Sequence, residues 1–426
     1  MLHVDKSEIR ERLHHGNIGL EKENLRINEN GYFAQSAHPF PNDKNIVRDF
    51  CENQIEVNTG VSTSAEGVVN ELTEYTRKIQ KKLSELKERE YLWPFSNPPY
   101  IINEENVPIA QFTGEQANKT VYRKYLSERY GRYKMTLSGI HFNYSFDDEL
   151  LERDFEYSGM KDFKTYKNEL YLTLAEHVVA YGWLLTALTA ASPLMDGSYV
   201  EKKQYDVDTF HGMASVRCSE LGYWNFFAPI MRYGSVEDYA DSIEEYVRDG
   251  WIRYPSELYY PVRLKPPGDN TMENLKKHGV GHIELRMIDL NPYEVCGLDV
   301  RDVEFAKLFL IWLASLPRYS PDRKAQVMAA QNFKNAAHYD LKTVRIVVPG
   351  DHSMAVADAG SLVLDRIREF YREEPAEVQE ILDFEEEKLL DPEKRYAWRV
   401  RKEFAGGYVQ KGLALAKEQQ KRLLKG

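Results

Sequence analysis

Cysteine is scarce in this chain of 426 residues. Its three cysteines, Cys51, Cys218 and Cys296, form no C-x-x-C pair. A zinc knuckle or a thioredoxin-type redox motif is therefore not expected. A sparse and odd cysteine count is typical of proteins that keep free thiols in a reducing compartment. We therefore expect a cytoplasmic protein.

Basic residues are too few to offset the acidic ones. Lys and Arg number 56 against 67 Asp and Glu, which gives a formal net charge of −11. A nucleic-acid groove needs the opposite excess, so no nucleic-acid partner is expected. The first eight residues are charged and lack an apolar run, which argues against a secretory signal.

Only one uncharged apolar stretch, residues 178–195, is long enough to cross a membrane. Pro193 interrupts its end, and Glu176 and His177 stand just before it. A helix buried in the protein core is the better interpretation. The sequence therefore predicts no membrane partner.

The common loops for binding nucleotides are missing as well. No G-x-x-x-x-G-K-[ST] occurs, and the near match Gly279-Val-Gly281 lacks a third glycine and leads into a predicted strand. Neither G-x-S-x-G nor H-E-x-x-H is present. If this protein uses ATP, it must bind the phosphates through metal ions and another kind of surface.

Helical periodicity is present in several long segments. Apolar residues three and four apart in residues 64–90 predict an amphipathic helix, with Ser62 or Ser64 as its N-cap. Residues 166–191 and 303–316 predict more deeply buried helices.

Four predicted strands have an unusual polar face. Residues two apart on a strand share a face, because successive side chains point to opposite sides. Solvated strands usually carry Thr, Lys and Ser on their polar face, whereas here Glu, His, Asn and Arg prevail. If the strands belong to one sheet, they line a concave, mostly acidic surface with helices on the other side, in an α+β fold. The four polar faces carry Glu21 and Glu23, then Gln54, Glu56 and Asn58, then His141, Asn143 and Ser145, and last His282, Glu284 and Arg286.

The acidic residues of these strands and their surroundings would be too many like charges for one dry site. Carboxylates that lie close together must take up protons or bind a cation. Magnesium ions, more than one of them, are the natural partners for oxygen ligands beside a triphosphate. The alternative is that the carboxylates point into solvent. The set comprises Glu21, Glu23, Asp49, Glu52, Glu56 and Glu284.

Two further residues on these faces have two interpretations each. Arg286 shares a face with Glu284, which suits contact with a transferred phosphoryl group, or else a structural ion pair. His141 is either a catalytic group or a hydrogen-bonded core histidine.

Seven segments resemble those of glutamate–cysteine ligase (γ-glutamylcysteine synthetase) of the bacterial type, in the same order, over about residues 16–316. The segments are G-L-E-K-E-N-L-R at Gly19, I-V-R-D-F-C-E-N-Q-I-E-V-N-T at Ile46, W-P-F-S-N-P-P-Y at Trp93, L-S-G-I-H-F-N at Leu137, V-R-C-S-E-L-G-Y at Val216, L-Y-Y-P-V-R at Leu258 and I-E-L-R-M-I-D-L-N-P at Ile283.

The resemblance implies a fold related to glutamine synthetase. In that fold an antiparallel sheet forms a concave funnel and the helices pack outside it. The expected organisation is one large catalytic domain over residues 1–426, in which residues 320–426 form a mostly helical part. The implied reaction is the first step of glutathione synthesis. ATP phosphorylates the γ-carboxylate of glutamate, and the amine of cysteine attacks the resulting acyl phosphate.

The resemblance also implies roles for single residues. The expected magnesium ligands are Glu21, Glu23, Asp49, Glu56 and Glu284, whereas Glu52 lies within a motif but is not expected to be a ligand. The expected catalytic groups are Arg286 and Arg123, as phosphate contacts, and His141, near the nucleotide phosphates. The expected amino-acid contacts are Arg217, Tyr223 and Tyr259, with Phe50 in the wall of the cysteine pocket.

One residue departs from the family pattern. Where relatives usually place a glutamine beside the acceptor pocket, this chain has Met135, which cannot donate that hydrogen bond. A sister ligase that joins glutamate to a different amine therefore stays open. So do a kinase without ligation and a binding protein without turnover.

The remaining expectations concern products and partners. No second ATP-binding module precedes Gly426, so the dipeptide is the expected product. The expected partners are small molecules, namely ATP, glutamate and cysteine. A monomer is compatible with the sequence, which does not decide the oligomeric state.

Overall fold

The polar strands predicted from the sequence lie side by side in one sheet. The computed structural model describes residues 1–200, 208–222, 224–350 and 352–425. Among these, seven strands form a single antiparallel sheet in the order β2-β3-β1-β5-β9-β8, with β4 paired to the end of β1. The strands are β1 (Asn17–Asn28), β2 (Ile46–Arg48), β3 (Gln54–Asn58), β4 (Glu90–Leu92), β5 (Ile140–Ser145), β8 (Val262–Lys265) and β9 (His282–Ile288).

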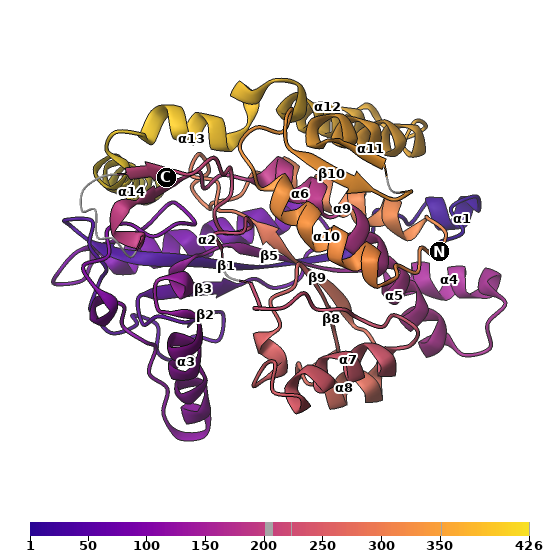
Figure 1. Ribbon diagram of the computed structural model, residues 1–426, viewed down its shortest axis with the longest axis horizontal. Helices are drawn as coiled ribbons and strands as arrows, with labels where there is room; N and C mark the ends of the chain where they lie inside the picture. Colours follow the sequence, from indigo (N-terminus) through magenta and orange to yellow (C-terminus); the bar gives the residue numbers. More distant parts are fainter. Residues whose placement is uncertain (201–207, 223, 351, 426) are drawn as a thin grey trace.

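One face of this sheet packs against helices and forms part of the main hydrophobic core. Apolar residues that alternate with the polar ones, such as Leu20, Phe142 and Leu285, are fully buried. They pack in one cluster with the apolar sides of helices that cover this face. Figure 1 shows α6, α9 and α10 above the strands and α3, α7 and α8 below them. The helices before residue 320 are α1 (Ser7–Arg10), α2 (Ala65–Ser84), α3 (Ala117–Tyr130), α4 (Asp148–Ser158), α5 (Phe163–Tyr181), α6 (Trp183–Thr189), α7 (Val236–Arg248), α8 (Met272–His278) and α9 (Val300–Ala314).

The predicted helices are present, with two corrections. Ser64 is the N-cap of α2 and accepts a hydrogen bond from the Gly67 N–H, but the helix ends at Ser84 instead of Glu90, because Glu90 begins β4. The helix predicted over 166–191 is interrupted at Gly182 and becomes α5 and α6. A Cβ atom at Gly182 would lie 2.6 Å from the Val178 carbonyl oxygen, so the close approach requires glycine.

The part from residue 320 onward is mostly helical and also contains a β-hairpin that the sequence analysis did not predict. The helices α11 and α12 pack against α9, and α14 packs against α2 and β4. A small sheet of β6 and β7 lies apart from the main one. The remaining elements are β6 (Leu194–Asp196), β7 (Asp208–Phe210), α10 (Arg323–Ala336), the hairpin β10 (Arg345–Val348) and β11 (His352–Ala355), α11 (Val356–Phe370), α12 (Ala376–Leu390), α13 (Tyr396–Phe404) and α14 (Tyr408–Lys425).

The stretch 178–195 forms the end of α5, α6 and the start of β6, and all of its residues except the partly buried Tyr181 are buried. Among the described residues, no helix has the length and apolarity needed to cross a membrane.

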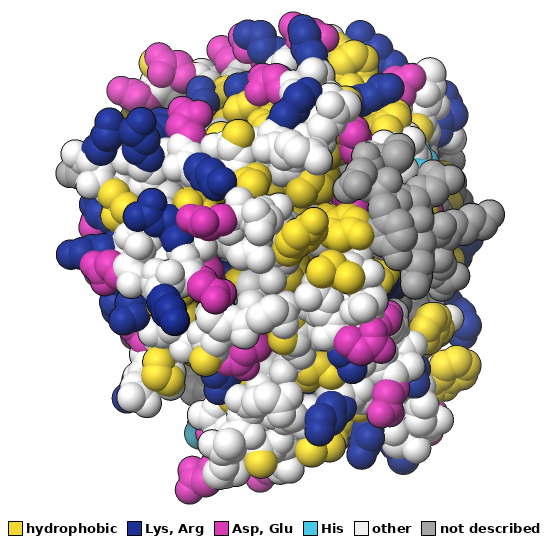
Figure 2. All heavy atoms as spheres, turned by 90° about the vertical axis from the view of Figure 1, so that its left-hand side faces the viewer, with side chains coloured by type: hydrophobic (Ala, Val, Ile, Leu, Met, Phe, Trp, Pro, Cys, Tyr) yellow, Lys and Arg dark blue, Asp and Glu magenta, His cyan; other side chains and the backbone are white. Residues whose placement is uncertain are grey.

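On the face drawn in Figure 2, acidic and basic side chains are interspersed, so the acidic excess does not gather there into one patch.

Candidate active site

Five carboxylates meet on the polar face of the sheet, and we call them the acidic cradle. The pairing of the strands explains the meeting: Glu23 of β1 lies opposite Glu56 of β3, and Glu21 lies opposite His141 of β5, which adjoins β9. Glu284 is fully buried, and Asp49 follows β2. All five line one cavity of about 210 Å³. The acidic cradle consists of Glu21, Glu23, Asp49, Glu56 and Glu284.

One end of the cradle is a compact group of three ligand-type side chains. Glu21, His141 and Glu284 each offer an atom, and these atoms lie within 4.8 Å of one another. Nδ1 of His141 is 2.9 Å from Oε2 of Glu21 and 3.7 Å from Oε1 of Glu284. Burial and the nearby Arg286 lower the pKa of His141, so its ring is neutral at neutral pH. Two carboxylates and a neutral imidazole are a donor set that suits a divalent cation.

At the other end, burial and mutual repulsion of the carboxylates outweigh the charge of the nearby arginines. Burial, followed by the neighbouring Asp49, raises the pKa of Glu23 well above its usual range. The same two causes, with Glu21, raise the pKa of Glu56 to about 8. A carboxylate that resists ionisation beside other carboxylates is where a bound cation would restore the charged form. The residues present therefore fit magnesium.

Cations border the cradle on the β9 side. Nη1 of Arg286 lies 3.0 Å from Glu284, and Nζ of Lys265 lies 3.1 Å from it. Burial opposes ionisation of Glu284, but Arg286 and Lys265 outweigh it and hold its pKa well below the usual range. Arg286 thus forms an ion pair with Glu284 and also lines the cavity, so both of its interpretations stay open.

Arg123 approaches the cavity from helix α3. Its Nε–H donates to the carbonyl oxygen of Asp49, and Nη2 lies 3.9 Å from the Asp49 carboxylate. The guanidinium also stacks over the ring of Phe112, at 4.7 Å. These contacts hold a second fixed cation beside the acidic cradle.

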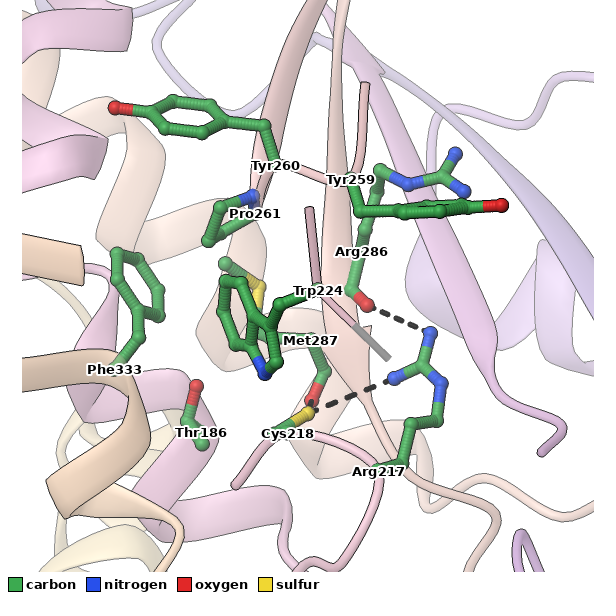
Figure 3. Close-up of a pocket in the computed structure, with 10 residues that line it drawn as sticks. All are labelled: Thr186, Arg217, Cys218, Trp224, Tyr259, Tyr260, Pro261, Arg286, Met287 and Phe333. Atoms are coloured by element: carbon green, nitrogen blue, oxygen red, sulfur yellow. Dashed lines mark hydrogen bonds between the residues drawn. The ribbon is translucent and has the colours of Figure 1, made fainter. Parts of the chain in front are cut away.

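The predicted amino-acid contacts lie in two adjoining cavities. Phe50, Met135 and Tyr259 line the acidic cavity. Arg217 lines a smaller one of about 60 Å³, which shares Tyr259 and Arg286 with the first. Figure 3 shows Arg217, Arg286 and Tyr259 on one side of this second pocket. The predicted Tyr223 lies outside the described residues.

Arg217 is held by a backbone carbonyl and by a thiol. Its Nη2 donates to the carbonyl oxygen of Arg286 at 2.7 Å, and its Nη1 contacts Sγ of Cys218 at 3.7 Å (Figure 3). A Cβ atom at Gly139 would lie only 2.3 Å from the guanidinium carbon, so this arrangement needs glycine there. The Gly139 N–H donates to Glu23, which connects the second pocket with the acidic cradle.

The sequence prediction missed two cations of the site. Arg263 and Lys265 of β8 line the acidic cavity, and Arg263 lies opposite Glu284 in the sheet. The signal was present, because Val-Arg-Leu-Lys alternates in the manner of a strand with one polar face. Glu52, which was not expected to be a ligand, pairs with Arg48 at 3.0 Å and accepts a hydrogen bond from the His38 N–H.

The sequence is similar to a known protein family. The family model described as glutamate-cysteine ligase matches residues 1–256 and 248–336. The bifunctional glutathione biosynthesis protein GshAB of Listeria welshimeri is 35% identical over 431 residues, which cover 97% of this chain and 55% of that protein. The protein of the same name from Clostridium perfringens is 31% identical over 94% of this chain and 54% of its own length. This chain thus spans about half the length of these relatives.

Two solved structures share the fold. The glutamate–cysteine ligase of Francisella tularensis, in complex with AMP, matches with a TM-score of 0.86 at 22% identity, over 96% of this chain and 89% of the other. A bifunctional glutathione synthetase from Pasteurella multocida matches with a TM-score of 0.85 at 25% identity, over 100% of this chain and 55% of the other. The family model covers far more than half of the sequence, and the chain belongs to the glutamate–cysteine ligase family.

Proposed function

We propose that the protein joins the γ-carboxylate of L-glutamate to the amine of L-cysteine with ATP, which is the first step of glutathione synthesis. The observation that carries this proposal is the acidic cradle between two fixed arginines, Arg286 and Arg123. Family membership supports the same reaction. We also propose that the polar face of the sheet forms a funnel that leads to the acidic cradle.

Magnesium fits the cradle, and we propose its ligands by group. Glu21 and Glu284 would hold one ion, with His141 beside them near the nucleotide phosphates, and Glu23, Asp49 and Glu56 would hold further magnesium. When bound, magnesium neutralises phosphate charge.

The protein groups have separable roles in the proposed reaction. A γ-carboxylate oxygen of glutamate attacks the γ-phosphorus of ATP, and ADP leaves. Arg286 and Arg123 would then stabilise charge on the transferred phosphoryl group from two sides. The neutral cysteine amine next attacks the acyl carbon, phosphate leaves, and the nitrogen releases a proton. Arg217, Tyr223 and Tyr259 would orient the amino acids, so that the amine meets the acyl phosphate before water does.

The acceptor amine has a second candidate because of Met135. This side chain is 7% exposed and lines the cavity with Phe50 and Leu126, so it offers an apolar wall. A sister ligase that uses another amine with a small apolar side chain would fit the same wall.

We further propose that residues 1–426 act as one catalytic unit, with the part from 320 onward packed on it, and that this unit works as a monomer in the cytoplasm. Every residue proposed above comes from one chain. The three cysteines are free and buried, which suits a reducing compartment.

The test is ADP release with ATP, magnesium and glutamate against a panel of amines that includes cysteine and 2-aminobutyrate. Release that depends on cysteine, with γ-glutamylcysteine found by mass, is the expected result. Turnover with another amine and not with cysteine would establish the sister ligase, whereas ADP release without any amine would indicate a kinase.

A further inference from the structure

The acidic cavity has a second wall, opposite the sheet, made by two separate segments. Helix α3 contributes Tyr122, Arg123 and Leu126 to it. Residues 254–261, which we call the tyrosine segment, contribute Ser256 and Tyr259. Bound substrates would have to contact both segments, so the spacing between the segments determines which groups can act together.

The carboxylate of Glu257 lies at the junction of these two segments. It is fully buried, yet it is not one of the cavity-lining carboxylates. Its Oε1 accepts hydrogen bonds from Tyr130 at 2.8 Å and Tyr125 at 3.1 Å, and Nε of Arg129 lies 2.9 Å away. Its Oε2 accepts from the Arg253 N–H at 2.7 Å. Three partners thus belong to α3 and one precedes the tyrosine segment.

The same junction extends to Tyr259 through Asn225. The Asn225 side chain donates to the Glu257 carbonyl oxygen at 2.9 Å and to the Tyr130 hydroxyl at 3.3 Å. Its oxygen accepts from the Tyr259 N–H at 2.8 Å. A single hydrogen-bonded network therefore connects the last turn of α3 with the backbone of a cavity-lining tyrosine.

Aromatic contacts also place α3 against the tyrosine segment, since Tyr130 packs edge-on against Tyr259 with 5.3 Å between centroids. The ends of α3 contact the adjoining turns 114–116 and 134–136, which are its own neighbours in sequence. The ring of Tyr122 packs edge-on against Tyr254, with 4.9 Å between centroids. The charged junction at Glu257 is the more directional contact, because its four donors converge on two oxygen atoms.

We propose that Glu257 is a positioning residue for the acceptor side of the site. It holds α3 at the spacing at which Arg123, Leu126 and Tyr259 face the same bound substrates. This proposal rests on the proposed ligase function, in which the amine must be aligned with an acyl phosphate. A displacement of about 1 Å in such a site can cost on the order of a hundredfold in rate.

The decisive variant is Glu257→Gln, which keeps the volume of the side chain. Its amide nitrogen cannot accept from the Arg253 N–H, and its neutral oxygen is a weaker acceptor for the α3 donors. We expect the KM for cysteine to rise about tenfold. The KM for glutamate should change less than twofold, because Arg217 lies outside this junction. Loss of folded enzyme would lower kcat and leave both KM values unchanged, so the selective rise separates positioning from folding.

Two companion variants sharpen the test. Tyr130→Phe should raise the KM for cysteine in the same direction, and combining it with Glu257→Gln should add little, because both act through one network. Glu128→Gln removes the same charge from an exposed position of α3 and should change nothing. An unchanged KM for cysteine in Glu257→Gln, or the same rise in Glu128→Gln, would overturn the proposal.

A second measurement does not depend on the reaction. Hydrogen exchange of the amides in 117–130 should accelerate in Glu257→Gln, whereas those of α9 should not change. If the wild-type protein forms no γ-glutamylcysteine, the proposed function fails and this measurement still decides the role of Glu257. Wild-type exchange in α3 of the variant would refute that role even in an active ligase.

Discussion

Two buried clusters of charge differ in how they are balanced. In the helical layer, Lys388 of α12 lies 2.5 Å from Asp302 and 2.8 Å from Glu385, and the Tyr396 hydroxyl donates to Asp302 at 3.0 Å. All of these side chains are buried, and they form a closed group. The acidic cradle instead opens into a cavity, and its carboxylates exceed the charge that its cations supply.

The difference distinguishes a cluster that stabilises the fold from a cluster that can bind a ligand. In the closed cluster one lysine faces two carboxylates, and burial raises the pKa of Glu385 well above its usual range, so a proton on Glu385 removes the excess charge. The cluster therefore joins α9, α12 and α13 without any ligand. In the cradle, burial and mutual repulsion raise the pKa values of Glu23 and Glu56, so a bound cation would favour the ionised form of these carboxylates. Burial of charge alone therefore does not identify a site, whereas burial with uncompensated charge beside a cavity does.

The largest expected effect is on the closed cluster. Lys388→Met leaves Asp302 and Glu385 buried without their cation, which should lower the free energy of unfolding by about 3–5 kcal/mol. Urea denaturation measures this free energy of unfolding. KM values of the folded fraction should stay those of the wild type. Lys394→Met removes an exposed lysine that pairs with Glu387 at 3.2 Å, and it should cost less than about 0.5 kcal/mol. Equal stability of the two variants would contradict the assignment of the closed cluster.

The second effect belongs to the cradle. Glu284→Gln should lower kcat/KM by about a hundredfold or more and leave the protein folded, because it removes a proposed metal ligand from the open cluster. Steady-state kinetics and a thermal unfolding scan measure the two properties. Glu52→Gln makes the same change outside the cavity and should cost less than about threefold. Near-normal turnover of Glu284→Gln would remove the metal assignment.

Magnesium itself should distinguish the two clusters. At ten times its dissociation constant, a ligand that binds only the folded state adds about 1.4 kcal/mol of stability. We expect this magnesium-dependent rise in the unfolding temperature for the wild type and for Lys388→Met. Glu284→Gln should lose most of it. A rise of equal size in all three proteins would place the ion outside the cradle.

The smallest expected effect tests space instead of charge. Gly139→Ala puts a methyl group where the Arg217 guanidinium lies, so Arg217 must shift. We expect the KM for glutamate to rise about fivefold, while the KM for ATP stays near the wild-type value. Substrate titrations at saturating partner concentrations measure both. If only the KM for ATP increased, Arg217 would be assigned to nucleotide binding instead.

Much of the cradle could be predicted because its information is local. The alternation in β1, β3, β5 and β9 places Glu and His residues on one face of each strand, and period-two patterns need no knowledge of the rest of the chain. Which strands pair, and in which register, is not local. The sequence therefore could not say that Glu21 lies beside His141.

The errors have physical causes of the same kind. Gly182 lies close to Phe333, which is distant in sequence and would be 2.8 Å from an added Cβ atom, so no local pattern reveals this contact. The sequence also could not show that Arg217 lies over Gly139 in a second pocket, because that contact joins distant parts of the chain. The network around Glu257 gives no local pattern, because its donors are more than 120 residues away on α3.

Strand β1 carries the core and the cradle on alternate residues. Leu20 packs under the helices, whereas Glu21 and Glu23 face the cavity, and Lys22 between them is buried on the helical side, where it donates to the Cys296 carbonyl oxygen. A one-residue insertion or deletion within Asn17–Asn28 would exchange the two sets of side chains. Length variation in this strand would thus abolish folding and catalysis in a single step, so natural or engineered insertions must fall elsewhere in the chain.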